Sequence, residues 1–204
     1  KWNSLNILSN NASTVGSYDL NILSSEDNRN LVLEGIGENK FDVLFLFGQD
    51  NLTFKKKNEF VIYIGSHGDN GAEMADLILP GAAYTEQDGH FVNLEGKIQK
   101  CYRASYPPGE AKEDYQIIND LSELIKGKKL FNNKNELIDD LMNYLKLNSK
   151  NFEDEIIKVD FVLDEKIIIN KIDYYYSNVI ARASVTMSEC RNKKIELKKT
   201  GTEG

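Results

Sequence analysis

The chain has 204 residues, of which 41% are hydrophobic and 28% charged, so it can bury a core and is not a disordered polyampholyte. Its net charge is −7 and it contains no basic stripe, which argues against a nucleic-acid partner. No apolar run approaches the ~20 residues that cross a bilayer, which argues against direct membrane insertion.

Three short apolar runs predict the strands of a parallel sheet. A predicted helix at residues 3–15, ended by Gly16, precedes them. The runs FDVLFLF (41–47) and FVIYI (60–64) are almost continuously apolar, which is typical of central parallel strands buried on both faces. A short helix and a third apolar run follow, and Pro80 halts that run. This alternation predicts an α/β fold: an open, mostly parallel sheet flanked by helices.

A hairpin and two helices are predicted after the third strand. The hairpin is expected to turn at Gly89 and Gly96. The first helix ends at a Gly-Lys-Lys sequence, and a capping box of Asn133 and Glu136 begins the second. The apolar stripe of the first helix consists of Tyr115, Ile118, Leu121, Leu124 and Ile125.

The C-terminal quarter is predicted to be a separate extension. Residues 148–176 hold two strand-like runs, EIIKVDFVL and KIIINKIDYYY, and a final helix follows with Ser177 or Asn178 as its cap. The apolar face of that helix would consist of Ile180, Ala183, Met187 and Cys190. We therefore predict an α/β domain at residues 1–147 and an extension with short strands and a final helix at residues 148–204.

The loop GSHGDNG (65–71), directly after the second strand, is the strongest candidate for a ligand site. A Walker loop would need Lys and Ser or Thr after its last glycine, but Ala72 and Glu73 stand there. The spacing G-x-x-G-x-x-G also differs from the dinucleotide fingerprint G-x-G-x-x-G. Asp69 and Glu73 would repel an anion at the following helix. These residues weigh against nucleotide binding, which stays open only because strand–loop–helix sites favour anions in general.

Metal binding and nucleophilic catalysis are weighed at the same loop. The two histidines are 23 residues apart and lack helical pairing, so they are a weak metal signal. We favour the interpretation that Asp69 serves the turn and His67 bonds locally. Ser66 and His67 are sequence neighbours, which usually cannot adopt the geometry of a nucleophile and its base. The plausible metal ligands are His67, Asp69, Glu86, Asp88 and His90.

The two cysteines, Cys101 and Cys190, are too few for an iron–sulfur cluster, which needs about four thiolates. We predict that both are free thiols in a reducing compartment. Composition and spacing therefore assign no catalytic, cofactor-binding or metal-binding residue to this chain.

Several motifs, in order along the chain, carry a resemblance to a known family. They are HGD-x-GA (67–72), ADLILPGAAYTE (75–86), VN-x-EG (92–96), PPG-x-A-x-ED (107–114) and ARASVTMSEC (181–190). With them, almost the whole chain resembles the C-terminal part of the 75-kDa iron–sulfur subunits of respiratory complex I, the NADH:ubiquinone oxidoreductase. Those subunits have the fold of the wider molybdopterin oxidoreductase superfamily, to which the motifs at 75–99 also belong. The stretch at 148–172 has no match.

The resemblance implies a non-catalytic structural part of complex I that supports electron transfer from NADH to ubiquinone. Residues 1–147 would then be the C-terminal part of a molybdopterin-oxidoreductase-like domain that binds no pterin. The iron–sulfur clusters and FMN are expected elsewhere in the complex. The implied partners are the N-terminal iron–sulfur part of the same subunit and other peripheral-arm subunits. The implied location is the matrix side of the mitochondrial inner membrane, or the cytoplasmic face of a bacterial inner membrane.

Two enzyme alternatives stay open. One is a fragment of an active molybdopterin oxidoreductase. The resemblance weighs against it, because active members follow the helix at 111–125 with a substantial β-barrel domain and only about 75 residues remain here. The other is a small nucleotide-binding α/β enzyme.

Overall fold

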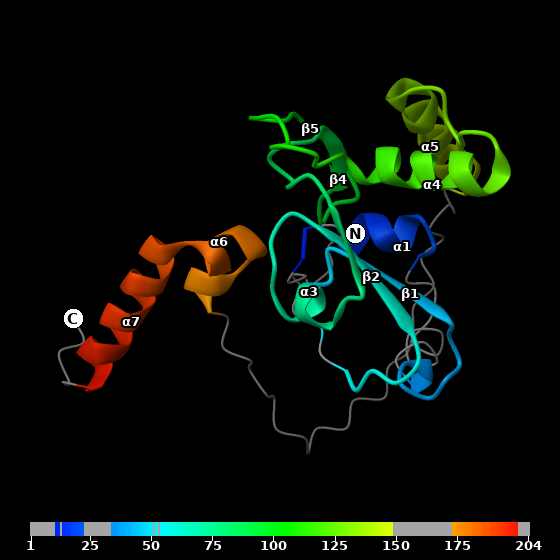
Figure 1. Cartoon of the computed structure of the whole chain (residues 1–204). Coiled ribbons are helices and arrows are strands. Elements are labelled where there is room, and N and C mark those ends of the chain that lie inside the picture. Colours follow the sequence, from blue (N-terminus) through cyan, green and yellow to red (C-terminus); the bar gives the residue numbers. More distant parts are fainter. Residues whose placement is uncertain are drawn as a thin grey trace, which may run out of the picture. The chain divides into compact units, whose positions relative to one another are not determined.

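The computed structural model describes residues 11–12, 14–22, 34–50, 52, 54–148 and 173–199 (Figure 1). The chain divides into two units, residues 1–150 and residues 151–204. Most of the helix predicted at 3–15, the strand-like run EIIKVDFVL and the first seven residues of the run KIIINKIDYYY lie outside the described residues. The end of the second run, Tyr174–Tyr176, forms a 3-10 turn and not the predicted strand. Within the described part of the chain, no helix is both long and apolar enough to span a bilayer.

The first unit contains the predicted parallel sheet. Its strands are β1 (Val43–Phe47), β2 (Phe60–Gly65) and β3 (Leu77–Pro80), in the order β1-β2-β3. Both pairings are parallel, with Leu46 opposite Tyr63 and Tyr63 opposite Ile78. The predicted α/β fold class is confirmed.

One face of this sheet forms the core. Leu46, Val61 and Tyr63 are buried on it. The connection from β1 to β2 and the short helix α3 (Asn70–Met74), which connects β2 to β3, both pack there (Figure 1). Two right-handed crossovers that advance in the same direction place both connections on the same face, so this arrangement is the one that chain chirality dictates. The residues packed against the core cluster are Leu44, Leu52, Phe54, Ala72 and Ala75.

The position of β1 differs from the prediction. Its continuous apolar run predicts a central strand buried on both faces, but within the described sheet β2 is central and β1 is at the edge. Val43, Phe45 and Phe47 are 48%, 38% and 39% exposed. Local sequence encodes a strand with two apolar faces, whereas burial of the second face depends on which other elements pack against it.

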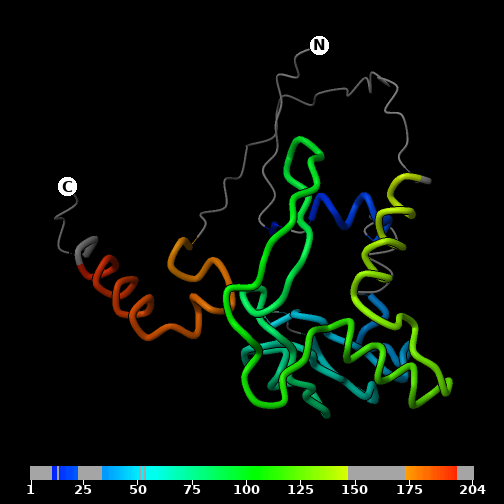
Figure 2. The backbone as a smooth tube through the Cα atoms, turned by 90° about the horizontal axis from the view of Figure 1, so that it is seen from above, coloured from blue at the N-terminus to red at the C-terminus, as the bar shows by residue number. Residues whose placement is uncertain are grey.

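The predicted hairpin forms from β4 (Gly89–Val92) and β5 (Ile98–Cys101), which pair antiparallel. Figure 2 shows this hairpin extending away from the parallel sheet. Gly96 is in the turn at a φ of 78°, as predicted, but Gly89 begins β4 and does not turn the chain. The Asn93 side chain closes the turn by accepting from the backbone N–H groups of Glu95 and Lys97.

The described part of the N-terminal region contains a short helix, α1 (Thr14–Asp19). The prediction that Gly16 ends a helix is wrong, because Gly16 lies inside α1. The reason is packing and not termination. A Cβ on Gly16 would be 3.3 Å from Cγ2 of Val92, so the glycine allows α1 to approach β4 closely.

Two longer helices complete the first unit: α4 (Asp114–Lys126) and α5 (Lys134–Asn148). Gly127 ends α4 in the left-handed conformation, at a φ of 70°. The predicted N-cap of α5, Asn133, is confirmed, because its Oδ1 accepts from the N–H groups of Asn135 and Glu136. The Glu136 carboxylate, however, accepts from Asn132 N at 2.8 Å and not from the Asn133 N of a capping box.

The second unit has a 3-10 turn, η1 (Tyr174–Tyr176), followed by α6 (Val179–Ala183) and α7 (Val185–Lys199). Asn178 caps α6, as predicted, by accepting from Ala181 N at 3.0 Å. The prediction of one continuous final helix is wrong, because Ser184 is extended and divides it. The Ser184 hydroxyl accepts from Met187 N and so begins α7, a capping role typical of serine.

Candidate functional site at the carboxyl edge of the parallel sheet

The carboxyl ends of β1, β2 and β3 lie at one edge of the parallel sheet. In open α/β sheets this edge is where ligands bind, which makes it the candidate site. Three segments form it: the loop at 48–50 after β1, the GSHGDNG loop after β2, and the segment around Gly81 after β3.

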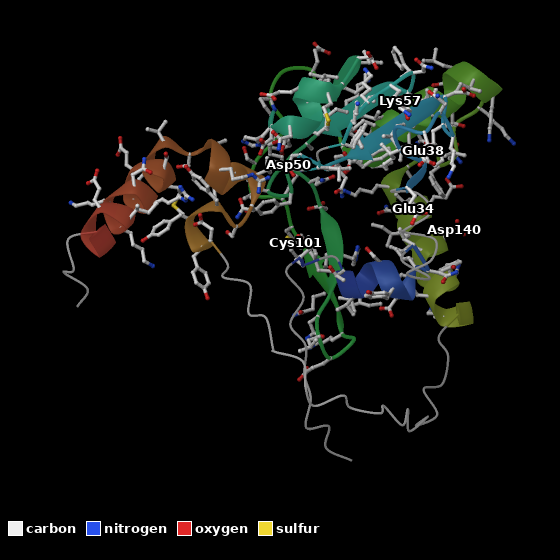
Figure 3. All side chains as sticks on the ribbon, turned by 90° about the horizontal axis from the view of Figure 1, so that it is seen from below. Glu34, Glu38, Asp50, Lys57, Cys101 and Asp140 are labelled. Atoms are coloured by element: carbon white, nitrogen blue, oxygen red, sulfur yellow. The ribbon has the colours of Figure 1, made fainter. Side chains whose placement is uncertain are left out.

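The ring of Tyr63 fills the inside of the GSHGDNG loop. Its hydroxyl donates to the backbone oxygen of His67 at 2.6 Å. A Cβ on Gly65 would clash with this hydroxyl, and a Cβ on Gly71 would be only 3.1 Å from two atoms of the ring. Gly71 N also donates to the backbone oxygen of Asp50, which is buried in the loop after β1 (Figure 3). The first and last glycines of the motif thus make room for Tyr63 and for the neighbouring loop.

Asp69 serves the turn, as the sequence predicted. It is the N-cap of α3: its carboxylate accepts from Asn70 N at 3.0 Å, and its backbone oxygen accepts from Ala72 N and Glu73 N. The backbone donors that could hold an anion at the start of α3 are therefore already bonded, three of them to Asp69 and Gly71 N to Asp50.

Ser66 and His67 do approach each other, contrary to the prediction. The Ser66 hydroxyl and the His67 Nδ1 are 2.9 Å apart at the protein surface. A nucleophile of this type needs a third group that orients the imidazole. The described residues provide no hydrogen bond to the other ring nitrogen of His67, so the pair is a local contact and not a triad.

The five residues weighed as plausible metal ligands are not brought together as a metal site. Among the described residues, no group of three His, Cys, Asp or Glu side chains could hold a metal ion. Glu86 accepts from Ala83 N at 2.9 Å, and Asp88 accepts from Arg103 N at 2.8 Å. That backbone hydrogen bond, followed by the charges of nearby lysines and Arg103, lowers the pKa of Asp88. Both carboxylates thus stabilise turns.

Asp114 is the last residue of the motif PPG-x-A-x-ED, but no role at this edge was predicted for it from the sequence. It begins α4, and a Cβ on Gly81 would be 3.2 Å from its Oδ1 atom. Gly81 N in turn donates to the backbone oxygen of Gly65 at 3.0 Å, which places Asp114 beside the ends of β2 and β3. Burial, and then the adjacent Glu113 carboxylate, raise the pKa of Asp114. The pair Glu-Asp at a helix start was the available signal, but only the fold puts it at this edge.

Lys134, at the start of α5, connects this helix to the start of α4 and to the residue before the hairpin. Its ammonium group donates to the Glu113 carboxylate and, at 2.6 Å, to the backbone oxygen of Asp88. Lys134 and Glu113 are only 24% and 13% exposed, so this ion pair is partly withdrawn from solvent. It fixes the start of α4 relative to the hairpin and the start of α5.

The carboxyl edge as a whole is acidic and internally bonded. Asp69, Glu73, Glu113 and Asp114 are all at the starts of the two helices that reach it. Carboxylates at helix N-termini stabilise the helices and disfavour a further anion there. These contacts therefore stabilise the loops and helix starts at the edge, and they leave few backbone donors for binding a phosphate.

Comparison with known proteins relates this chain to molybdopterin oxidoreductases and to NADH-quinone oxidoreductase subunits. Residues 1–124 match the family model for molybdopterin oxidoreductases. A subunit of the NADH-quinone oxidoreductase of Rickettsia bellii is 39% identical over 208 residues, covering 98% of this chain and 29% of that protein. The NADH-ubiquinone oxidoreductase 75 kDa subunit of Reclinomonas americana and the mitochondrial 78 kDa subunit of Candida albicans are each 36% identical, over 93% of this chain and 28% of their own length. The chain thus spans less than a third of these curated relatives.

Proposed function

The chain belongs to the molybdopterin oxidoreductase family, and from this premise we propose that it is a non-catalytic structural part of a complex I-type NADH:quinone oxidoreductase. The observation that carries the proposal is the similarity to bacterial and mitochondrial NADH-quinone oxidoreductase subunits, which runs over 93–98% of the chain. In this role the chain supports electron transfer from NADH to quinone by packing and not by chemistry.

The family implies a molybdenum pterin, and the residues of the carboxyl edge do not fit one. A pterin cofactor carries phosphate and needs donors, but the N–H groups at the start of α3 are already bonded to Asp69 and Asp50. The ring of Tyr63 occupies the inside of the loop after β2, and Asp114 adds a carboxylate beside the ends of β2 and β3. We therefore propose that this chain holds no pterin.

The electron carriers are then expected in other parts of the complex. Cys101 is half-buried at the end of β5 (Figure 3), and Cys190 is exposed on α7 in the second unit. Two thiols on separate units do not form the ligand set of an iron–sulfur cluster. The clusters and FMN would be held by the remaining polypeptides, while this chain maintains their support.

For its partners, we propose the N-terminal iron–sulfur part of the same subunit and other peripheral-arm subunits. For its location, we propose the matrix side of the mitochondrial inner membrane, or the cytoplasmic face of a bacterial inner membrane. The relatives support both locations, because one is named a mitochondrial subunit and others come from bacteria. Neither location requires this chain to enter the bilayer.

Native electrophoresis of the source membranes tests the proposal. An antibody against this chain should detect it in a large band that oxidises NADH. Metal analysis of that band should give iron without stoichiometric molybdenum, and its fluorescence should show flavin. Migration outside the NADH-oxidising band would refute the assignment to complex I. Molybdenum at one per chain would support the alternative favoured by family membership, an active molybdopterin oxidoreductase fragment. A bound nucleotide released from the isolated chain would support the small α/β enzyme.

A further inference from the structure

The parallel sheet has an open face opposite its core. In a parallel sheet, residues paired across strands lie on the same face, so the register defines its members. We call these residues the open face: Val43, Phe45, Phe47, Phe60, Ile62, Ile64, Leu77 and Leu79. All eight are apolar, which is the pattern of a face that packs against other elements and not of one that faces water.

Exposure on the open face is concentrated at β1 and at the first residues of β2 and β3. The exposed fractions of Val43, Phe45 and Phe47 are 48%, 38% and 39%, and those of Phe60 and Leu77 are 46% and 41%. Ile64, at the other end of β2, is in contrast only 2% exposed. The rings of Phe45 and Phe47 stack on each other with centroids 6.1 Å apart, so they form a continuous aromatic surface.

The connections within this sheet do not cover the open face. The residues that connect β1 to β2 and β2 to β3 pack on the opposite face, against Leu46, Val61 and Tyr63. Parallel sheets occur almost only with both faces covered. Any helices that cover Phe45 and Phe47 must therefore come from outside the segment from β1 to β3.

The length of the relatives identifies the source of these helices. This chain spans 28–29% of the complex I subunits that it resembles, so most of the polypeptide in those proteins lies outside it. A second copy of the chain would offer an identical sheet face, whereas α/β sheets are covered by helices. Two copies would also bring together chains that each carry a charge of −7.

We propose that the open face is the docking surface for apolar helices of the polypeptide that forms the rest of the 75-kDa-type subunit. Whether that polypeptide is continuous with this chain or separate makes no difference to the contact. The inference rests on the proposed function and adds the surface through which the chain is held. Phe45 and Phe47 are the central anchors, because large aromatic side chains supply most of the binding energy in such contacts.

Site-specific photo-crosslinking in the native assembly tests this contact. Phe45→p-benzoylphenylalanine should crosslink, after irradiation and peptide mass spectrometry, to a helix from the remaining part of the 75-kDa-type subunit. The matched control is Tyr102→p-benzoylphenylalanine, at a residue that is 71% exposed and outside the open face. The control should not yield that crosslink. Crosslinks from position 45 to a second copy of the chain, to a different subunit, or to no polypeptide would each overturn the proposal.

A charge on the open face gives a second measurement. Phe47→Glu should lower the amount of chain retained in the NADH-oxidising band about tenfold or more, because it buries an unpaired carboxylate in an apolar contact. Tyr102→Glu should leave retention unchanged. Equal retention of the two variants would contradict the docking surface. Wild-type chain that is absent from the NADH-oxidising band would instead refute the proposed function, so the two failures are distinguishable.

Discussion

Removing the Asn119 side chain is expected to open the loop between α4 and α5. Asn119 is on α4 and only 6% exposed. Its Oδ1 accepts from Leu130 N and Phe131 N at 3.0 and 3.1 Å, and its Nδ2 donates to the Phe131 oxygen at 2.8 Å. One side chain thus supplies three hydrogen bonds to a loop that has no regular structure of its own.

The magnitude follows from these contacts. Each net hydrogen bond contributes roughly 1 kcal/mol, so Asn119→Ala should destabilise the closed loop by about 3 kcal/mol. Since every ~1.4 kcal/mol is tenfold, the amides of Leu130 and Phe131 should exchange with solvent about a hundredfold faster. Ser122→Ala is the matched control, because Ser122 is similarly buried on the same helix and makes one bond, to the Lys128 oxygen. It should accelerate exchange only about fivefold.

Hydrogen exchange followed by mass spectrometry of the peptide at 128–133 measures both effects. Unchanged exchange in Asn119→Ala would refute the reasoning. An acceleration in Ser122→Ala as large as that in Asn119→Ala would refute it as well, because the number of lost hydrogen bonds would then not set the effect.

Three further predictions concern the parallel sheet and its carboxyl edge. Gly71→Ala should lower the free energy of unfolding by about 1–3 kcal/mol, because the new Cβ meets an aromatic ring and a backbone oxygen. In the control Gly68→Ala the new Cβ makes only an ordinary contact, so the free energy of unfolding from urea titrations should change little. Lys134→Met should lower the melting temperature by about 4–8 °C. The substitution leaves the largely buried Glu113 carboxylate without its ammonium partner, at a cost of about 2 kcal/mol. An unchanged melting temperature in a thermal scan would contradict this reasoning. The pKa of Asp76 is lowered first by its hydrogen bond from a lysine and then by one from a β2 amide, so its contribution to stability is present above its unfolded pKa and lost as pH falls toward the folded value. The difference in stability between wild type and Asp76→Asn should therefore shrink below about pH 4, and a constant difference from pH 7 to pH 3 would rule this out.

The carboxyl edge illustrates how structure decides between uses of one motif. Glycine-rich loops after parallel strands commonly admit phosphates. Here the space made by Gly65 and Gly71 is taken by Tyr63, which comes from the preceding strand. The sequence contains both the glycines and the tyrosine, but their contact requires the loop to fold back over its own strand. A residue-by-residue motif comparison does not contain that information.

Several features were determined by sequence alone because they depend on short-range interactions. The three apolar runs became strands, and Asn133 and Asn178 cap helices as predicted. Each of these outcomes depends on contacts within a few residues, which side-chain chemistry and periodicity encode directly.

Only the tertiary structure decided the environment of these elements. The apolar run of β1 specifies a strand with two apolar faces, but its edge position and the exposure of Phe45 depend on distant segments. In the same way, Gly16 lies inside a helix because α1 packs closely on β4, and Asp114 reaches the carboxyl edge because α4 starts beside β3. Burial and strand order are properties of long-range packing, and local patterns in one chain cannot fix them.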